Sequence, residues 1–310
     1  MFVLETKNLT KVYPTGGGCF DITLAVEQGE VFGLLGPNGA GKSTFVKMLV
    51  GLLRPTGGEG RLLGLPLRLP AARRQVGYLP ENFRYHDWMS ARELLEFHGA
   101  LHGLDHREIR TRIPEVLSMV NLRGVEGRLV RTFSKGMQQR LGLAVALLTG
   151  PRLLFLDEPT SALDPIGRKE IRETILQLRG RGVAVFLNSH LLTEVERVCG
   201  RVAVINKGRI RAQGSLEALL GAGLEVEMHV GGVTAALMER LAKQGTVTRS
   251  ERDEQRDIQK IWVRVASKEQ IPVLAESVVN SGNKLYLFSP KRSTLEELFV
   301  ELVAGDDHGV

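Results

Sequence analysis

A strand–loop–helix signal at residues 31–53 constrains the fold of this chain more than any other stretch. The compact apolar run VFGLLG (31–36) is typical of a buried strand, and the glycine-rich segment PNGAGKST (37–44) follows it at once. The next residues, FVKMLVGLL (45–53), carry apolar side chains at helical spacing. A strand that feeds through a glycine loop into a helix predicts a parallel sheet flanked by helices.

Residues 36–43, GPNGAGKS, match the pattern G-x-x-x-x-G-K-[ST] in full and lie between a strand and a helix, as this motif requires. Its glycines allow the backbone to curl so that successive N–H groups face one centre and bind an anion. The lysine then reaches the terminal phosphates of a nucleotide, and the serine hydroxyl can ligate Mg²⁺. The residues predicted to hold the nucleotide here are Gly36, Pro37, Asn38, Gly39, Ala40, Gly41, Lys42, Ser43 and Thr44.

Two adjacent carboxylates, Asp157 and Glu158, follow a second apolar run in LLFLDEP (153–159). Ligands of open parallel sheets bind beyond the carboxyl ends of the strands, so both carboxylates are expected near the phosphates. Neighbours in an extended chain point in opposite directions, which predicts different roles for the two. Asp157 is the predicted magnesium ligand, and Glu158 is predicted to polarise an attacking water.

A histidine follows the third apolar run, GVAVFLN (182–188), in the sequence FLNSH. A lone histidine is more often structural, but His190 would emerge on the same rim as Glu158. There it could hydrogen-bond the terminal phosphate or the water. The predicted catalytic residues are therefore Glu158, His190 and Lys42.

The chain divides into two predicted domains, residues 1–221 and 222–310. Strand and helix patterns alternate in the first domain, which predicts a parallel sheet, and a helical block at about 88–150 interrupts them. Ser90 with Glu93 and Asp105 with Glu108 form capping boxes in that block, and Pro114 is expected to kink or split the second helix. The second domain reads β-α-β-β-α-β plus a last helix, the order of a split ferredoxin-like domain.

Composition excludes some functions. Lys+Arg 41 against Asp+Glu 35 gives a net charge of +6, which is too diffuse to imply a nucleic-acid partner. The arginine clusters at 69–75 and 105–112 read as solvated faces, with contact to an anionic surface as the alternative. The two cysteines lack metal-ligand spacing, which favours a reducing compartment. No signal peptide and no run of roughly 18 apolar residues is present, so the chain is not expected to cross a membrane.

Taken together, these motifs resemble the ATP-binding cassette (ABC) ATPase family over about residues 2–220. The phosphate loop is 36–43, FSKGMQQ (133–139) stands at the family's signature, and 153–158 is the Walker B run. SALD (161–164) matches the D-loop, and His190 matches the switch histidine. The fold that this resemblance implies is an α/β P-loop ABC ATPase cassette, with a parallel-sheet core and an inserted helical subdomain. A small α+β domain follows it.

The resemblance also implies a shared ATP site. In this family two cassettes pack head to tail, and the signature helix of each addresses the ATP held by the other. Signature residues expected to bind the partner's ATP are Ser134, Lys135, Gly136 and Gln138. Lys135 stands where the family usually has glycine. Glu81 stands at the position of the family's Q-loop glutamine and is the third predicted magnesium ligand, after Ser43 and Asp157. Tyr13 matches the adenine-stacking position, with inward packing as the alternative.

The sequences GYLPE (77–81) and SKGMQQRLGLA (134–144) are similar to cassettes that serve ABC-2 type permeases, including copper-maturation, multidrug and gliding-type cassettes. The implied function is the ATP-hydrolysing subunit of an exporter. It would bind ATP and Mg²⁺ as a homodimer or heterodimer and drive a separately encoded membrane permease. It would be cytoplasmic, peripheral on the inner face of the membrane, with no nucleic-acid partner.

Two alternatives stay open. One is an ABC ATPase of DNA repair or translation, although this chain has a single cassette and no sustained heptads. In the other, residues after 222 regulate the cassette, either by binding a small molecule or as an interaction or dimer-steadying module.

Overall fold

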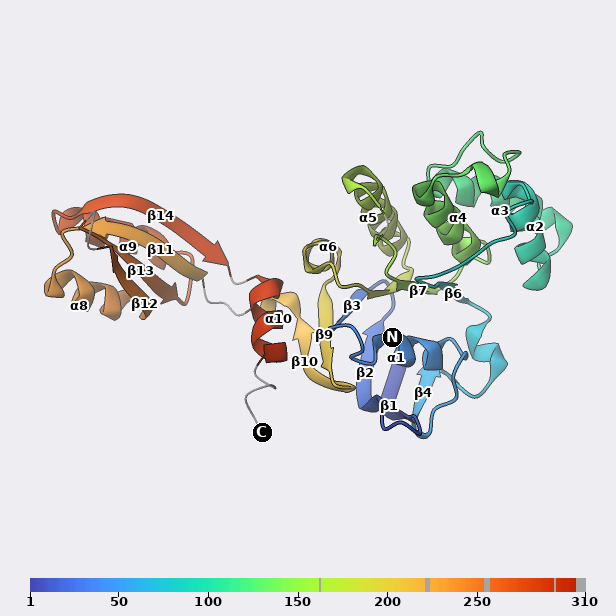
Figure 1. Cartoon of the computed structure of the whole chain (residues 1–310), viewed down its shortest axis with the longest axis horizontal. Helices are drawn as coiled ribbons and strands as arrows, with labels where there is room; N and C mark the ends of the chain where they lie inside the picture. Colours follow the sequence, from blue (N-terminus) through green and yellow to red (C-terminus); the bar gives the residue numbers. More distant parts are fainter. Residues whose placement is uncertain (162, 221–223, 254–256, 293, 305–310) are drawn as a thin grey trace. The chain divides into compact units, whose positions relative to one another are not determined.

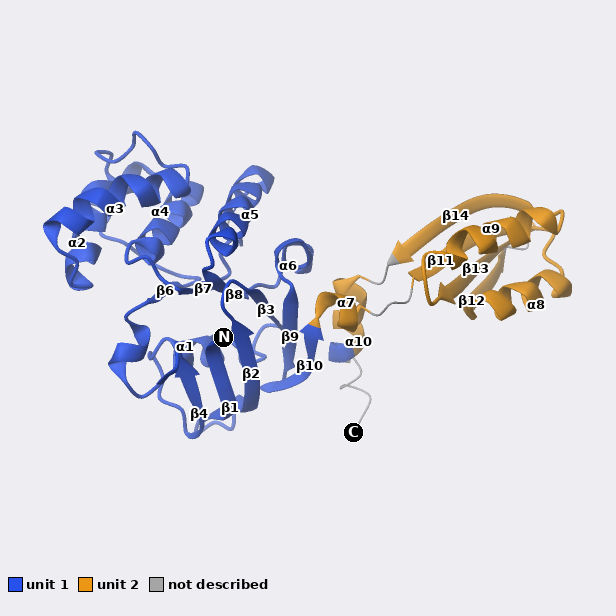
Figure 2. Cartoon of the chain, turned by 180° about the vertical axis from the view of Figure 1, so that it is seen from behind, with its two compact units in different colours: residues 1–214, 302–310 blue, residues 215–301 orange. Residues whose placement is uncertain are grey.

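The computed structural model describes residues 1–161, 163–220, 224–253, 257–292 and 294–304. The chain forms two compact units, Met1–Gly214 with Leu302–Val310 (unit 1) and Ser215–Glu301 (unit 2) (Figure 1, Figure 2). The predicted domain boundary between residues 221 and 222 lies outside the described residues, as does residue 162 of the predicted D-loop.

A six-stranded sheet in the order β10-β9-β3-β8-β7-β6 forms the centre of unit 1. Its central strands pair in parallel, β3 with β8 and β9, and β7 with β6 and β8, which confirms the predicted parallel sheet. Every residue of β3, β7 and β8 is buried, as expected for strands covered on both faces. The strands are β3 (Val31–Leu35), β6 (Val76–Leu79), β7 (Leu153–Asp157), β8 (Ala184–Asn188), β9 (Arg201–Asn206) and β10 (Arg209–Ser215).

A second sheet, in the order β2-β1-β4-β5, shares a hydrophobic core with the first. Its pairs are antiparallel, and its strands are β1 (Phe2–Val12), β2 (Gly18–Glu27), β4 (Gly57–Leu62) and β5 (Leu65–Pro66). Helix α1 (Lys42–Leu49) contributes Phe45 to this core, where its ring lies 6.2 Å from that of Phe186. The predicted strand–loop–helix unit is therefore packed at the centre of the molecule's larger unit.

Three helices of the inserted block gather to one side of the sheets of unit 1 (Figure 1). They are α2 (Ala91–Leu101), α3 (His106–Met119) and α4 (Lys135–Leu147). The short 3₁₀ turn η2 (Val130–Thr132) precedes α4 within the block, and η1 (Pro70–Arg73) precedes the block. Both predicted capping boxes are present. The expected split at Pro114 is wrong, because α3 runs through it. The remaining helices of unit 1 are α5 (Pro165–Gly180) and α6 (Leu192–Val198).

Unit 2 has an antiparallel sheet in the order β12-β13-β11-β14. With helices after the first and third strands, this is the predicted split ferredoxin-like arrangement. Buried side chains of β11, β13, α8 and α9 form its own core. The elements are α7 (Leu216–Leu219), β11 (Leu224–Gly231), α8 (Ala235–Gln244), β12 (Thr246–Asp253), β13 (Ile258–Val265), α9 (Gln270–Asn280) and β14 (Lys284–Arg292). Helix α10 (Leu295–Ala304) ends the described chain.

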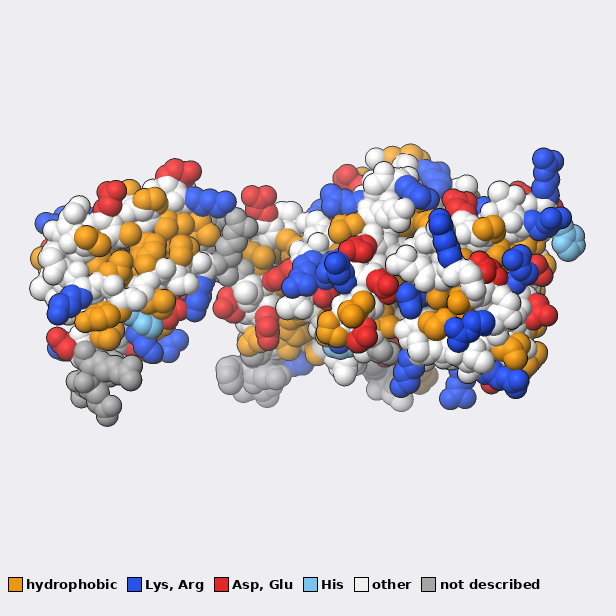
Figure 3. Space-filling view, turned by 90° about the horizontal axis from the view of Figure 1, so that it is seen from above, with side chains coloured by type: hydrophobic (Ala, Val, Ile, Leu, Met, Phe, Trp, Pro, Cys, Tyr) orange, Lys and Arg blue, Asp and Glu red, His pale blue; other side chains and the backbone are white. Residues whose placement is uncertain are grey.

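Hydrophobic side chains also lie on the surface of unit 2. Figure 3 shows them grouped on the face of this unit that is turned to the viewer. Large exposed hydrophobic residues of unit 2 include Val273, Val279, Tyr286 and Leu287. The exposed fraction of Tyr286 is 59%, so this residue lies on the surface of unit 2 and not in its core.

Candidate functional site

Most of the predicted site residues line one pocket of about 620 Å³ in unit 1. The pocket lies where β3, β7 and β8 end, at the carboxyl edge of the parallel sheet. Its lining residues are Tyr13, Gly18, Asn38, Gly39, Ala40, Gly41, Lys42, Ser43, Thr44, Glu81, Asp157, Glu158, Asn188 and His190. Residues from five separate stretches of sequence are thus brought together.

The phosphate loop has the curled backbone that its glycines predict. Gly39 and Gly41 have φ angles of +80° and +102°, in the left-handed region that disfavours other residues. A Cβ at Gly41 would also lie 2.8 Å from the carbonyl oxygen of Gly18. A side chain at position 41 would therefore clash with the neighbouring backbone and distort the loop.

Lys42 is held over the loop by two carbonyl groups. Its Nζ donates to the oxygen of Gly36 at 2.6 Å and to that of Pro37 at 3.1 Å. Gly36 and Pro37 therefore position the lysine rather than line the pocket. Burial lowers the pKa of Lys42, while the charges of Glu158 and Asp157 oppose this shift. The lysine is the cation that the pocket offers to an anionic ligand.

Asp157 ends β7 and faces Asn188, which ends β8. The two residues are paired in register, and Asn188 Nδ2 donates to Asp157 Oδ1. Burial raises the pKa of Asp157, and the charges of Glu81 and Glu158 add to this, while the Asn188 hydrogen bond and Lys42 oppose it. Sequence reasoning missed Asn188, although its place at the end of a buried strand two residues before His190 was a usable signal.

Glu158 leaves the strand in a left-handed conformation with φ of +51°. Its backbone N–H donates to the carbonyl of Asn188 at 2.8 Å, and its Oε2 lies 2.7 Å from His190 Nδ1. The expectation that Asp157 and Glu158 point in opposite directions is wrong, because the backbone turn brings both carboxylates into one pocket. Strain of this kind at a non-glycine residue is typical of functional sites.

Tyr13 and Glu81 complete the pocket from outside the central sheet. Tyr13 is half-buried just after β1, and Lys11 Nζ lies 5.8 Å from its ring centroid. Tyr13 belongs neither to the core shared by the two sheets of unit 1 nor to the core of unit 2, which disfavours the inward-packing alternative. Glu81 adds a third carboxylate opposite the single lysine, so the pocket carries excess negative charge.

The signature residues do not line this pocket. Ser134 is the N-cap of α4, and its Oγ accepts from the backbone N–H of Met137 at 3.2 Å. Ser134 and Lys135 are exposed, and Gln138 Nε2 donates back to the carbonyl of Phe133 at 3.4 Å. The free N–H groups of this helix start, with its partial positive charge, are therefore presented outward.

The sequence aligns with curated proteins along almost its whole length. An ABC transporter ATP-binding protein of Nostoc sp. is 40% identical over 98% of this chain and 91% of its own length. The chain belongs to the ABC transporter ATP-binding proteins. The ABC transporter family profile matches residues 19–161. The linearmycin resistance ATP-binding protein of Bacillus subtilis is 34% identical over 97% of this chain and 98% of its own length.

Solved structures agree with this assignment. The ATP-binding subunit of an ABC transporter has a TM-score of 0.65 at 32% identity, over 70% of this chain and 91% of its own. A dimeric post-hydrolysis cassette bound to ADP and Pi has a TM-score of 0.62 at 25% identity, over 69% of this chain and 99% of its own. The chain is thus the ATP-binding subunit of an ABC transporter and an ABC ATPase, as predicted. The alternative of a DNA-repair or translation ATPase is wrong.

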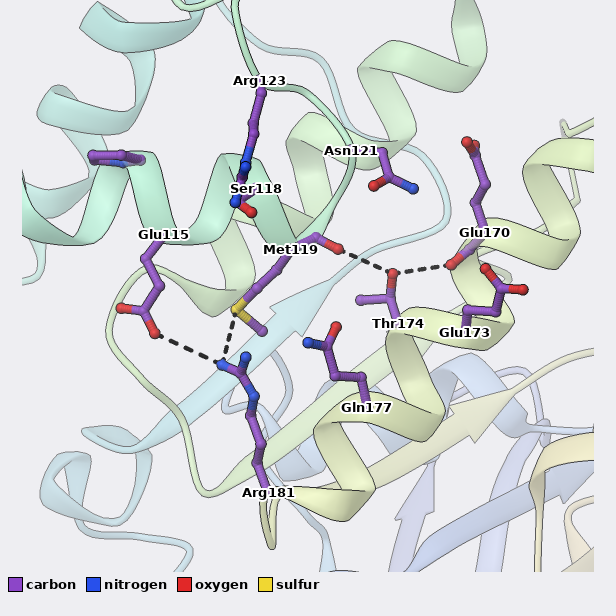
Figure 4. A pocket seen from close by; sticks show the side chains of 11 residues that line it. Glu115, Ser118, Met119, Asn121, Arg123, Glu170, Glu173, Thr174, Gln177 and Arg181 are labelled. Carbon is purple, nitrogen blue, oxygen red and sulfur yellow. Dashed lines mark hydrogen bonds and ion pairs between the residues drawn. The ribbon is translucent and has the colours of Figure 1, made fainter.

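A second pocket of the cassette, of about 490 Å³, lies between α3 and α5 (Figure 4). Thr174 Oγ1 donates to the carbonyl of Met119 at 3.3 Å, and Arg181 lies 3.7 Å from Glu115. No predicted site residue lines this pocket. Its polar contacts join the inserted helical block to α5.

Asp157→Asn is expected to raise the Tm of unit 1 in the nucleotide-free protein by roughly 2–4 °C near pH 8, the shift that about 1 kcal/mol produces in a domain of about 150–250 residues. Burial and the neighbouring carboxylates raise the pKa of Asp157, so its ionised form destabilises the fold. That cost is absent below the carboxyl's ordinary pKa of 3.8 and develops as pH rises through the folded-state value. The gain should therefore shrink on acidification in thermal melts. Asp87→Asn, at an exposed position, is the control, and a pH-independent gain would contradict this account.

Proposed function

We propose that this chain is the motor subunit of an ABC-2 type exporter. Two copies, or one copy and a homologous cassette, bind Mg-ATP between them head to tail and drive a separately encoded permease. The observation that carries the proposal is the pocket that joins Lys42 and the paired Glu158 and His190, while the signature helix start faces outward. Relatives named for export support the exporter class, including a Nod factor export ATP-binding protein of Cupriavidus metallidurans, 36% identical over 97% of both chains.

In this proposal the phosphate loop binds the triphosphate through its backbone N–H groups and Lys42. Glu158 accepts the proton of the attacking water, and His190, bonded to Glu158, orients that carboxylate and the terminal phosphate. Tyr13 stacks on the adenine. The nucleotide-binding residues of the pocket half are Tyr13, Asn38, Gly39, Ala40, Gly41, Lys42, Ser43 and Thr44, and Gly36 and Pro37 contribute by holding Lys42.

Mg²⁺ fits the donor set of the pocket. Three carboxylates and a serine hydroxyl line it against one lysine, and the Asn188 amide oxygen is buried without a partner among the described residues. No group of three acidic, histidine or cysteine side chains in the described chain is arranged as a complete metal site. This is compatible with Mg²⁺, which is usually held by one or two carboxylates plus phosphate and water. Ser43, Asp157 and Glu81 would hold the ion, which neutralises phosphate charge.

The other half of each site comes from the second cassette. Ser134, Lys135, Gly136 and Gln138 would address the partner's terminal phosphate with hydroxyl, cationic and backbone N–H donors. The exposed N-terminus of α4 supports this role, since its donors lack partners from the cassette's own pocket. Hydrolysis removes the shared phosphate and weakens the contact between the two cassettes.

We place the nucleotide-binding domain at residues 1–221, with the helical subdomain at about 88–150, and an accessory domain at 222–310. None of the described helices has the length and apolarity of a membrane span. Association with the inner face of the membrane would then come from contact with the permease.

Co-expression with a candidate permease tests the proposed function. The chain should co-purify with the permease in detergent, and ATP turnover should change when the permease is present. The Lys42→Ala chain, which should fail to hold the phosphates, is the control for turnover. A chain that neither associates with any permease encoded beside it nor hydrolyses ATP would refute the proposal.

We also propose that the accessory domain is an interaction module that steadies the dimer. Its exposed Tyr286 and Leu287 support this, because large apolar side chains on a surface commonly mark contact sites. Tyr286→Ser with Leu287→Ser is expected to weaken ATP-dependent dimerisation by at least about tenfold, since tenfold corresponds to about 1.4 kcal/mol and burying one such side chain contributes about 1.5–3 kcal/mol. Analytical ultracentrifugation measures this, and Lys243→Ser on α8 is the control. Loss of nucleotide affinity in the double variant would refute the assignment.

A further inference from the structure

A third pocket in unit 1, of about 750 Å³, lies apart from the nucleotide pocket and shares no lining residue with it. Its walls come from β4 and β5, from the turn after α1 and from η1. Four arginines line it, Arg54, Arg61, Arg68 and Arg73, and Glu59 is its one acidic lining residue. We call this the arginine pocket.

The arginine pocket carries excess positive charge, because four arginines line it against Glu59. Within the parts of the chain that the structure describes, none of its four arginines forms an ion pair. Elsewhere in unit 1 the structure does pair arginines with carboxylates, as in Arg140 with Glu170 at 2.9 Å and Arg172 with Glu194 at 3.0 Å. Four unpaired guanidinium groups around one hollow repel each other, and an anion bound there would relieve that repulsion.

Arg73 is fixed in place by the fold. Its guanidinium donates to the carbonyl of Leu67 at 2.6 Å and packs over Gly51, where a Cβ would lie 2.5 Å from Arg73 Nε. Gly51 has a φ of +85°, so the turn after α1 both requires glycine and leaves room for the arginine. Arg73 Nε is buried without a hydrogen-bond partner among the described residues. A half-buried cation held by carbonyls, with no carboxylate, is costly unless an anion approaches it.

We propose that the arginine pocket binds a phosphate-bearing anion, either a soluble phosphorylated compound or the headgroup of an anionic lipid. Guanidinium groups match phosphate oxygens with paired, charge-assisted hydrogen bonds, and four arginines line this pocket. The volume lies within the range of small-ligand pockets, about 300–1,000 Å³. Leu53, Pro66 and Leu67 give the pocket an apolar wall for the organic part of such a ligand. This inference is independent of the exporter assignment.

Titration with pyrophosphate, measured by calorimetry, tests the soluble source. The full-length Lys42→Ala chain is the background, because it removes the main phosphate contact of the nucleotide pocket. Arg61→Gln with Arg68→Gln changes two exposed arginines of the arginine pocket, so folding should be unaffected. The control, Arg107→Gln with Arg110→Gln, removes the same charge from exposed positions on α3. If the ligand is soluble, the pocket variant should bind pyrophosphate at least tenfold more weakly than the background chain does. The affinity of the control variant should stay within twofold of the background value.

Sedimentation with vesicles tests the lipid source. The background chain and the control variant should both sediment with phosphatidylglycerol vesicles. The affinity of the pocket variant for these vesicles should be at least tenfold lower. Phosphatidylcholine vesicles should bind none of the three chains. Loss confined to pyrophosphate supports a soluble ligand, and loss confined to vesicles supports a lipid headgroup. Equal behaviour of the pocket and control variants with both probes would overturn the proposal.

Discussion

Replacing Glu158 by glutamine is expected to lower ATP hydrolysis by about 10²–10⁴-fold, the usual contribution of a positioned general base. Glutamine keeps the shape of the side chain, and its amide can still bond His190, which lies 2.7 Å from Glu158 Oε2. It cannot accept a proton from water. ATP binding should persist, because the loop and Lys42 that hold the phosphates are unchanged. Removing one of the three carboxylates that line the pocket should even strengthen binding of the anionic nucleotide.

Turnover and oligomeric state measured together give the sharpest reading of this variant. Phosphate release should be nearly abolished, while size-exclusion chromatography with Mg-ATP should show an accumulated dimer that the wild-type chain forms only transiently. Glu173→Gln removes a charge from an exposed position on α5 and should leave both readouts unchanged. A Glu158→Gln chain with near-normal turnover would contradict the assignment of Glu158 as the base.

Local signals in the sequence were sufficient for much of this fold. The phosphate loop follows from glycine positions between a strand and a helix, and the capping boxes at Ser90 and Asp105 depend on residues three positions apart. The order of elements in unit 2 was predicted from short alternating runs such as LEVEMHV (224–230) and KIWVRVA (260–266), with helical segments between them. Pro114 shows where local preference fails, since packing of Ile113 and Leu117 on the same helix keeps α3 continuous.

Features that depend on contacts between distant residues were not accessible in the same way. The turn that brings Glu158 beside Asp157 requires the carbonyl of Asn188, thirty positions away along the chain, as acceptor for the Glu158 N–H. An alternation rule for extended chain cannot contain that contact. The arginine pocket is similar, because its lining residues come from the turn after α1, from β4 and from η1, and no local pattern in the sequence shows that these pack around one hollow.

A shared site makes a complementation experiment decisive, because two defective chains should restore one another. Ser134→Asp keeps the helix cap of α4, since aspartate is as good an N-cap as serine, but it sets a carboxylate against the partner's triphosphate. Lys42→Ala removes the cation from the other half of the site. Each variant alone has both sites broken, and its ATP turnover is expected to fall by about 10²–10³-fold, as when a positioned donor is lost.

Co-expression of the two variants with different tags, followed by tandem purification, isolates dimers that contain one of each. One site of that dimer combines both defects, and the other joins the intact loop of one chain to the intact signature of its partner. Its turnover is therefore expected to return to about half of the wild-type value, one working site of two in a twofold dimer. Pairing Lys42→Ala with Glu158→Gln is the matched control. Those two residues line the same pocket of one chain, so both sites stay broken and no recovery should appear. No recovery in the first mixture would mean that Ser134 acts on its own chain's nucleotide, and recovery in the control mixture would contradict the placement of Lys42 and Glu158 in one site.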